Sequence, residues 1–208
     1  MSTRLRFPGR TGVSFVSAVL LAVAVVALVL AVALPIDQLG QEGGSVPVSP
    51  GDLGGDQSLD VAGLPGGVSV ANATAEAVLT ASELPAGLRV LTELPTALTL
   101  LAVAIGAWLL GRVLSAIHGG HPFDQRNPGR LAGLAAAVLL GGLVAPLSQA
   151  VVTSAVLAHL DLVGPDGPFL AFEATLSFVP VGVALALTAA AEAFRRGLVL
   201  EDELEGTV

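Results

Sequence analysis

The sequence contains no cysteine and few charged residues, since only 12% of its 208 residues are Asp, Glu, Lys or Arg. Without cysteine the chain can form no disulfide, no thiolate metal site and no cysteine nucleophile. Soluble domains carry about a quarter charged residues, so this shortage argues against a soluble globular domain. The formal net charge of -8 also argues against general nucleic-acid binding, which requires a basic surface.

Long apolar stretches take up much of the chain. A membrane-spanning helix needs about 20 predominantly apolar residues, and four stretches meet this length: residues 13–34, 96–117, 131–158 and 172–194. The sequence therefore predicts an all-α integral membrane protein with a bundle of four transmembrane helices, forming a single membrane domain over residues 1–208. The third stretch exceeds one perpendicular crossing, and tilting or a kink at Pro146 would accommodate it.

The basic residues, all of them arginine, are unevenly distributed between the polar segments. Eight of the nine precede the first stretch, flank the link between the second and third, or follow the fourth; only Arg89 lies elsewhere. Because excess arginine marks the cytoplasmic side, both termini are predicted to be cytoplasmic. The abundance of Ala, Gly, Val and Leu is typical of GC-rich bacteria, so we expect a multi-pass protein of the bacterial plasma membrane. The first stretch also fits a signal peptide cleaved after residues 31–33, which would leave the remaining orientation unchanged.

Residues 35–94 then form an extracytoplasmic acidic segment. It carries eight acidic residues against Arg89 alone, and glycine and proline punctuate its first half. Residues 59–62 and 68–71 are predicted as the two strands of a short β-hairpin, and residues 74–91 as one or two short helices broken near Pro85. Because an isolated hairpin is marginal in water, we expect this segment to rest on the outer helix ends.

Small and polar residues recur at every fourth position of the third stretch. Four-residue spacing places them on one helix face, and small residues let helices pack closely in lipid. We therefore predict a helix-packing groove formed by Gly133, Ala137, Gly141, Ala145 and Gln149, with Thr153 beyond it. Gln149 is expected to bond to a neighbouring helix, the alternative being a place on a substrate path. Glu192 is expected to pair with Arg195 and Arg196.

The sequence contains no Walker loop, no Gly-x-Ser-x-Gly elbow and no dinucleotide-binding fingerprint. His118, His121 and Asp124 are ligand types that zinc accepts, but no fourth ligand is evident. The glycine pair between the histidines suits a turn leaving the second helix. We therefore predict no catalytic, cofactor-binding or metal-binding residues, and no enzymatic activity.

Two segments on the predicted cytoplasmic side have distinctive sequences. The link reads Gly-Gly-His-Pro-Phe-Asp-Gln-Arg-Asn-Pro-Gly-Arg-Leu over residues 119–131, and residues 194–208 end the chain with an acidic tail followed by Thr-Val. Together they resemble the bacterial four-span family known as domain of unknown function 2975 (DUF2975). The resemblance covers roughly residues 90–208, whereas the outer segment departs from the family pattern.

The resemblance implies a regulatory partner rather than an activity, because members of that family often accompany a small helix-turn-helix regulator. The residues that carry the motif are Pro122, Phe123, Asn127, Arg130, Gly197 and Glu201. From the residues themselves, Asn127 is predicted to be a helix N-cap with Pro128 at the first helical position. Residues 195–208 form an acidic cytoplasmic tail, and its residues 201–205 are predicted to pair with Arg126 and Arg130.

These patterns favour a non-enzymatic membrane protein that binds a cytoplasmic partner through its inner loop and tail. The alternative is a small transporter or channel subunit with Gln149 on the path. Besides the lipid bilayer and the cytoplasmic partner, we expect no direct nucleic-acid contact, and homo-oligomerisation is left open.

Overall fold

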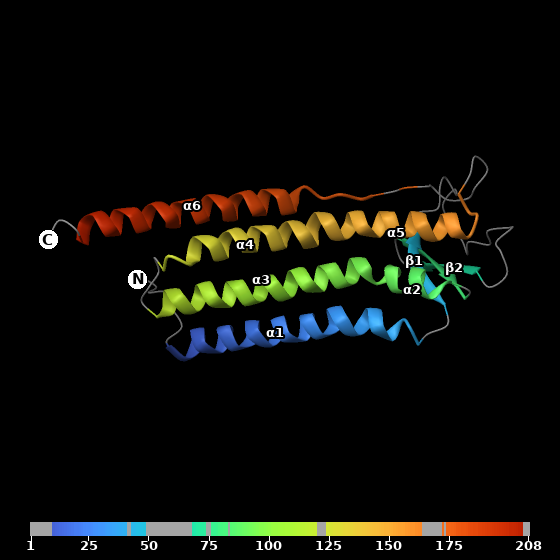
Figure 1. Cartoon of the computed structure of the whole chain (residues 1–208), viewed down its shortest axis with the longest axis horizontal. Coiled ribbons are helices and arrows are strands. Elements are labelled where there is room, and N and C mark those ends of the chain that lie inside the picture. The colour runs from blue at the N-terminus through green and yellow to red at the C-terminus, as the bar shows by residue number, and fades with distance from the viewer. Residues whose placement is uncertain are drawn as a thin grey trace, which may run out of the picture. The chain divides into compact units, whose positions relative to one another are not determined.

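The chain is mostly helical, with one small sheet (Figure 1). The computed structural model describes residues 10–40, 43–48, 68–73, 76–82, 84–119, 124–163, 172 and 174–205. The chain forms two compact units, and each is assembled from segments that are distant in the sequence. Unit 1 consists of residues 1–29, 99–142 and 177–208, and unit 2 of residues 30–98 and 143–176.

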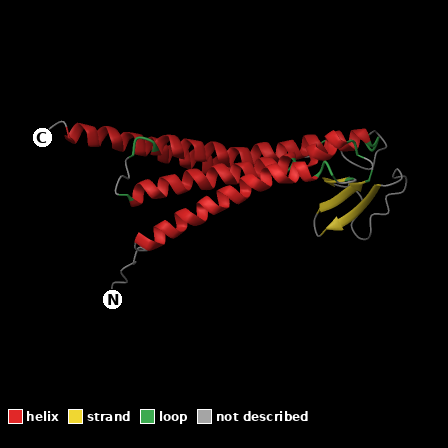
Figure 2. Cartoon of the chain, turned by 60° about the horizontal axis from the view of Figure 1, so that its bottom comes forward, coloured by secondary structure: helices red, strands yellow, loops and turns green. Residues whose placement is uncertain are grey.

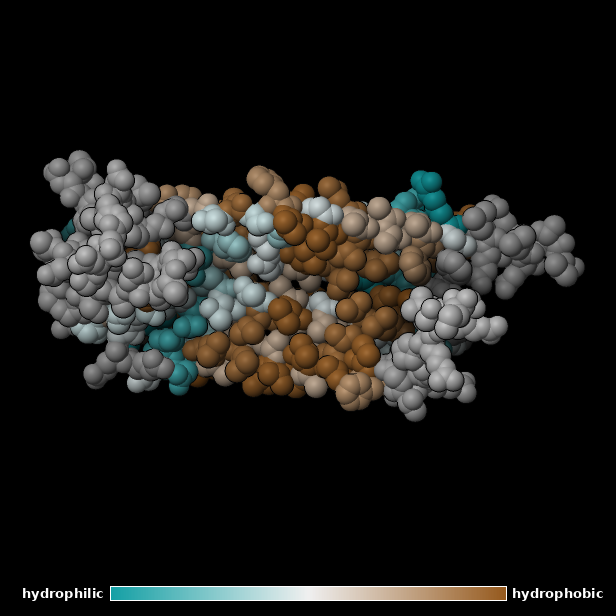
Figure 3. All heavy atoms as spheres, turned by 180° about the vertical axis from the view of Figure 1, so that it is seen from behind, coloured by the Kyte–Doolittle hydropathy of each residue, from teal (hydrophilic) through white to brown (hydrophobic). Residues whose placement is uncertain are grey.

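Three helices are long and apolar enough to cross a membrane, as predicted for the first three stretches: Phe15–Asp37, Leu94–His118 and Asn127–His159. The first belongs to α1 (Arg10–Asp37) and the second is α3 (Leu94–His118). Large apolar side chains on α1 are exposed, among them Val25 and Leu28. Figure 3 shows this apolar surface along the bottom of the view. A helix that is apolar on its exposed side is suited to lipid rather than water.

The third of these helices changes its winding along its length. It begins as α4 (Asn127–Leu139), passes through the π-helical turn η1 (Leu140–Val144) and continues as α5 (Ala145–His159). Pro146 is the second residue after η1, and it has no N–H to donate to the carbonyl four residues earlier, that of Gly142. A π turn relieves this mismatch, because it pairs each carbonyl with the N–H five residues later.

The fourth apolar stretch is helical only over α6 (Val179–Glu205), which packs along α4 in unit 1. The predicted start at residue 172 is wrong, since residues 174–177 are not helical. Pro180 suits the first turn of α6, where its missing N–H costs no bond. The apolar part, residues 179–191, is therefore shorter than the about 20 residues of a typical span. α6 is not among the three candidate spans.

Unit 2 contains a three-stranded antiparallel sheet in the order β1-β3-β2 (Figure 2). Its strands are β1 (Gly44–Val48), β2 (Val68–Ala73) and β3 (Glu76–Ala81). In the central strand, Leu79 pairs with Val46 of β1 and with Val70 of β2. Leu79 and Val46 are buried with Val156 and Leu157 of α5 in one apolar core. A short helix, α2 (Ala86–Thr92), follows the sheet.

One strand of the predicted hairpin is confirmed, and it pairs with β3. Residues 68–71 lie within β2, whereas residues 59–62 lie outside the described part of the chain. The helical prediction for residues 74–91 is wrong over Glu76–Ala81, which form β3, and only Ala86–Thr92 are helical after the break at Pro85. Burial explains the strand, because Leu79 and Ala81 are buried while Thr80 between them is exposed. This is the two-residue period of a sheet with one covered face.

Gly43 makes the entry into β1 possible. Its φ of 105° lies in the left-handed region, and an added Cβ would lie 2.8 Å from the carbonyl oxygen of Ala81. We expect Gly43→Ala to lower the free energy of unfolding by about 1–3 kcal/mol through backbone strain, measured by thermal denaturation in detergent. Gly87→Ala in α2 is the control, since no heavy atom lies within 4 Å of its added carbon. Equal melting temperatures for the two variants would contradict this reading.

Candidate functional site

The segment before α4 is a hydrogen-bonded turn in unit 1. Oδ1 of Asp124 accepts a hydrogen bond from the backbone N–H of Arg126 at 2.9 Å. The carbonyl oxygen of Asp124 accepts one from the backbone N–H of Asn127, also at 2.9 Å. Aspartate favours this arrangement because its side chain bonds the backbone two residues later. The turn fixes the direction in which α4 begins.

Asn127 and Arg130 connect this turn to α3. Asn127 is fully buried, and its Oδ1 accepts a hydrogen bond from Nη1 of Arg130 at 2.8 Å. The same nitrogen lies 3.4 Å from Oδ2 of Asp124 and 3.4 Å from the carbonyl oxygen of Arg112 in α3. The bond to Asn127 has the best length for an N–H···O contact. Arg130 therefore holds the turn, the first residue of α4 and the last turns of α3 together.

The prediction that Asn127 is the N-cap of this helix is wrong by one position. α4 begins at Asn127, Arg126 occupies the N-cap position without a side-chain cap bond, and Pro128 lies one residue further into the first turn than predicted. An Asn-Pro pair suits either register, because both residues are common at helix starts. Tertiary contact decides between them, since the amide of Asn127 is turned to Arg130.

The hydrogen bonds and charges of the turn favour the ionised form of Asp124. The pKa of Asp124 lies below its ordinary value because the backbone N–H of Arg126 donates to the carboxylate and the guanidinium of Arg130 lies nearby. A carboxyl with a lowered folded pKa stabilises the fold above its ordinary pKa and loses this contribution as the pH falls through the folded value. At neutral pH Asp124 is therefore ionised, and its interactions with Arg126 and Arg130 stabilise the turn.

The other residues of the predicted motif are placed only in part. Gly197 and Glu201 lie in α6, whose backbone is helical to Glu205. Pro122 and Phe123 lie outside the described residues, as do the side chains after residue 199. Pairing of the acidic tail with Arg126 and Arg130 therefore stays a prediction. The expected ion pairs of Glu192 are confirmed, at 2.8 Å to Nε of Arg195 and 2.9 Å to Nε of Arg196.

The first half of the predicted packing groove faces α3 in unit 1. A Cβ on Gly133 would lie 2.9 Å from Cδ1 of Leu109, and one on Gly141 would lie 3.0 Å from Cβ of Ala102. Ala137, between these two glycines, is buried. Each of the two glycines therefore occupies a place where a larger side chain would meet α3.

The second half of the predicted groove follows η1 and belongs to unit 2. Ala145 is buried, and Nε2 of Gln149 donates to Oγ1 of Thr153 at 3.2 Å. The hydroxyl of Thr153 donates in turn to the carbonyl oxygen of Pro47 in β1 at 3.3 Å. Gln149 thus bonds to a residue of its own helix, α5, and not to a neighbouring helix as predicted. The π turn inserts one residue per turn, so a strict four-residue spacing does not follow one face across it.

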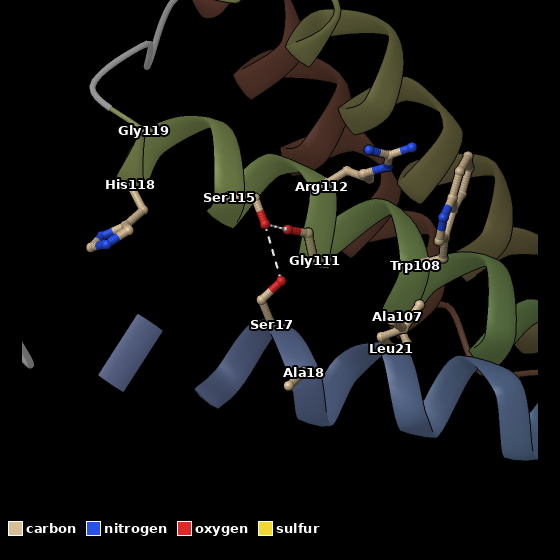
Figure 4. Close-up of a pocket in the computed structure, with 10 residues that line it drawn as sticks. All are labelled: Ser17, Ala18, Leu21, Ala107, Trp108, Gly111, Arg112, Ser115, His118 and Gly119. Carbon is tan, nitrogen blue, oxygen red and sulfur yellow. Dashed lines mark hydrogen bonds between the residues drawn. The ribbon is translucent and has the colours of Figure 1, made fainter. Parts of the chain in front are cut away.

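Unit 1 also contains a pocket of about 640 Å³ between α1 and α3 (Figure 4). Its lining includes Ser17 and Leu21 of α1, and Trp108, Arg112, Ser115 and His118 of α3. Ser115 and Ser17 point toward each other, with their hydroxyl oxygens 3.0 Å apart. No sequence pattern predicted this pocket. The sequence feature that could have indicated the pocket is the presence of serine and arginine inside otherwise apolar stretches.

Among the described residues, no group of three or more His, Cys, Asp or Glu is arranged to hold a metal ion. His118 is the last residue of α3, and Asp124 is engaged by Arg126 and Arg130. His121 lies outside the described part of the chain. The arrangement before α4 thus consists of hydrogen bonds and charges that brace a loop.

No curated protein and no solved structure matches the chain. The sequence profile of a family described as "Protein of unknown function (DUF2975)" matches residues 72–208, which is more than half of the chain. The match includes α3, the braced turn, α4 and α6, and it confirms the resemblance carried by residues 119–131 and 194–208. The chain therefore belongs to the DUF2975 family of proteins of unknown function.

Proposed function

We propose that this protein is a non-enzymatic, multi-pass protein of the bacterial plasma membrane that binds a cytoplasmic partner through the turn before α4 and the tail of α6. One observation carries the proposal. Asn127 is fully buried and bonded to Arg130 at 2.8 Å, while Gln125 and Arg126 next to it are exposed. A rigid loop loses little conformational entropy when a partner binds, so the bracing suits a recognition surface.

The proposal includes a topology with four spans, in which α6 is the fourth. Its apolar residues 179–191 are followed by Arg195 and Arg196, whose long side chains can extend to the membrane surface. Arg112 lies near the end of α3, and Arg126 and Arg130 lie at the start of α4. The positive-inside rule therefore favours a cytoplasmic location for these ends and for both termini. The acidic residues 35–94 then face the outside.

The charges of the turn before α4 and of the tail of α6 indicate what kind of partner can bind there. The turn exposes Arg126, whereas the tail carries Glu201, Asp202, Glu203 and Glu205 on a helix that extends to Glu205. Complementary potentials guide association and select partners. A small helix-turn-helix regulator, which the family resemblance implies, has a basic DNA-reading surface that an acidic helix would complement. Binding there would compete with DNA, so the membrane protein would hold the regulator away from its operator.

A small transporter or channel subunit is the alternative function. It requires a polar path through the spans, and Gln149 is the residue proposed for it. The amide of Gln149 donates to Thr153, and Thr153 donates to Pro47 of β1. These bonds connect α5 to the sheet, so we put partner binding first. Self-association is compatible with both functions.

A photo-crosslinking amino acid at position 126 tests the proposal in native membranes. We expect irradiation of the tagged full-length protein to give one discrete covalent adduct with a cytoplasmic protein. The control has the same amino acid at Leu185, an α6 residue that is 65% exposed and lies in the apolar part of that helix. An adduct of the same mass at both positions, or none at position 126, would contradict the proposal.

A further inference from the structure

The pocket between α1 and α3 changes from polar to apolar along the helices (Figure 4). Ser17 lies near the start of the first candidate span, and His118 is the last residue of the second. Leu21 and Trp108 lie about one to three turns further into those spans, and 55% and 47% of their surfaces are exposed. The pocket thus has its polar end at a membrane surface and its apolar end in hydrocarbon.

The two serine hydroxyls are arranged as hydrogen-bond acceptors. Ser115 donates its only hydroxyl hydrogen to the carbonyl oxygen of Gly111 at 2.8 Å. Ser17 must therefore donate its own hydrogen to Ser115, 3.0 Å away. Both hydrogens are then used, and Ser17 can only accept further bonds. A ligand that bears hydroxyl groups can donate to Ser17, whereas the oxygens of a phosphodiester cannot.

Arg112 gives the pocket a positive charge between the two serines and Trp108 (Figure 4). Its guanidinium lies 5.6 Å from the centre of the Trp108 ring, and stacking on a ring leaves the N–H groups at the edge of the guanidinium free to bond. None of the ion pairs among the described residues involves Arg112. Arginine matches phosphate well because it offers two parallel N–H donors.

We propose that this pocket binds an anionic glycerophospholipid whose headgroup carries hydroxyl groups, as phosphatidylglycerol does. Arg112 binds the phosphate, Ser17 accepts from a headgroup hydroxyl, and the acyl chains leave past Leu21 and Trp108. The volume of about 640 Å³ is in the range of small-molecule sites. Basic pockets between membrane helices at the cytoplasmic side bind lipid headgroups in general. The site goes beyond the partner-binding function and does not depend on it.

The chain provides its own reporter for this test. Trp108 is its single tryptophan, and the chain has no tyrosine, so the fluorescence comes from the pocket itself. The full-length protein is reconstituted into phosphatidylcholine vesicles that contain brominated phosphatidylglycerol or brominated phosphatidylcholine at the same mole fraction. We expect the anionic lipid to quench with an about tenfold higher apparent affinity, the ratio expected from charged hydrogen bonds.

Two variants separate the pocket from general surface charge. Arg112→Gln should abolish the preference for phosphatidylglycerol, whereas Arg126→Gln, on the exposed turn outside the pocket, should keep it. Brominated phosphatidylmethanol has the same charge without headgroup hydroxyls and should quench less than phosphatidylglycerol. Each variant is referred to its own phosphatidylcholine control, because Arg112 also contacts the ring of Trp108.

Three results would overturn the proposal. Equal quenching of the wild-type protein by the two brominated lipids would exclude a selective site, even if Arg112→Gln failed to fold. Loss of preference in Arg126→Gln as well would indicate surface charge alone. Reversal of quenching by soluble glycerol 1-phosphate would assign the pocket to a free phosphate ester instead of a lipid.

Discussion

Gly142→Leu is expected to lower the free energy of unfolding by about 3 kcal/mol, the upper part of the range for overpacked positions. Gly142 lies in the π turn η1, and any Cβ added there would overlap Cβ and Cγ of Pro180 in the first turn of α6. The ring of proline cannot rotate away as a long side chain could. One of the two helices must therefore shift. The change is measured by denaturant titration of the purified protein in mild detergent.

Gly182→Leu is the matched control, because it lies on α6 two residues after Pro180 and a Cβ there meets no heavy atom within 4 Å. It should leave the unfolding midpoint close to that of the wild type. The helix propensity of leucine exceeds that of glycine in both variants, so propensity cannot produce a difference between them. Similar midpoints for the two variants would show that η1 does not pack tightly on α6.

Asn127→Leu is expected to cost about 2 kcal/mol, the size of a hydrogen bond to a charged group. Leucine has nearly the same shape as asparagine, but it removes the oxygen that accepts from Arg130 at 2.8 Å. Only 16% of the Arg130 side chain is exposed, so water replaces the lost acceptor poorly. Denaturant titration would measure this loss, and limited proteolysis of the turn should become faster.

A double-mutant cycle with Arg130→Met isolates the contact between these side chains. The double variant should cost clearly less than the two single variants together, because each single change already breaks the same bond. Arg126→Ala, on the exposed residue between Asp124 and Asn127, serves as the surface control. Additive costs for Asn127→Leu and Arg130→Met would show that the bond does not brace the turn.

The sequence alone was sufficient to predict the helices that consist of a long apolar run. The predicted residues 96–117 and 131–158 differ from α3 and from the helix Asn127–His159 by only a few residues at each end. Proline occurs both inside a helix and in the first turn of a helix, and the local sequence does not distinguish these two cases. Pro35 lies inside α1, whereas Pro180 lies in the first turn of α6. Helix ends depend on caps and tertiary contacts more than on hydropathy.

The sheet and the hydrogen bonds that brace the turn depend on contacts between residues that are distant in the sequence, so local patterns could not predict them. Glu76–Ala81 became a strand because β1 and β2 pair on its two sides, and β1 was not predicted at all. Apolar residues in so short a segment fit a helix or a strand equally well. The role of Arg130 could likewise not be derived, since Asn127 and the carbonyl of Arg112 come together only after α3 and α4 pack.

Pro47 has a consequence for self-association through the sheet. β1 is an edge strand, and the carbonyl of Pro47 accepts from Thr153 of α5, so it points away from β3. In a strand, the N–H and C=O of one residue point to the same side, so proline here costs the sheet no ladder bond and offers no donor to another chain. α5 and Pro47 together block strand addition and aggregation along this edge. Growth of the sheet by a second copy would have to begin at β2.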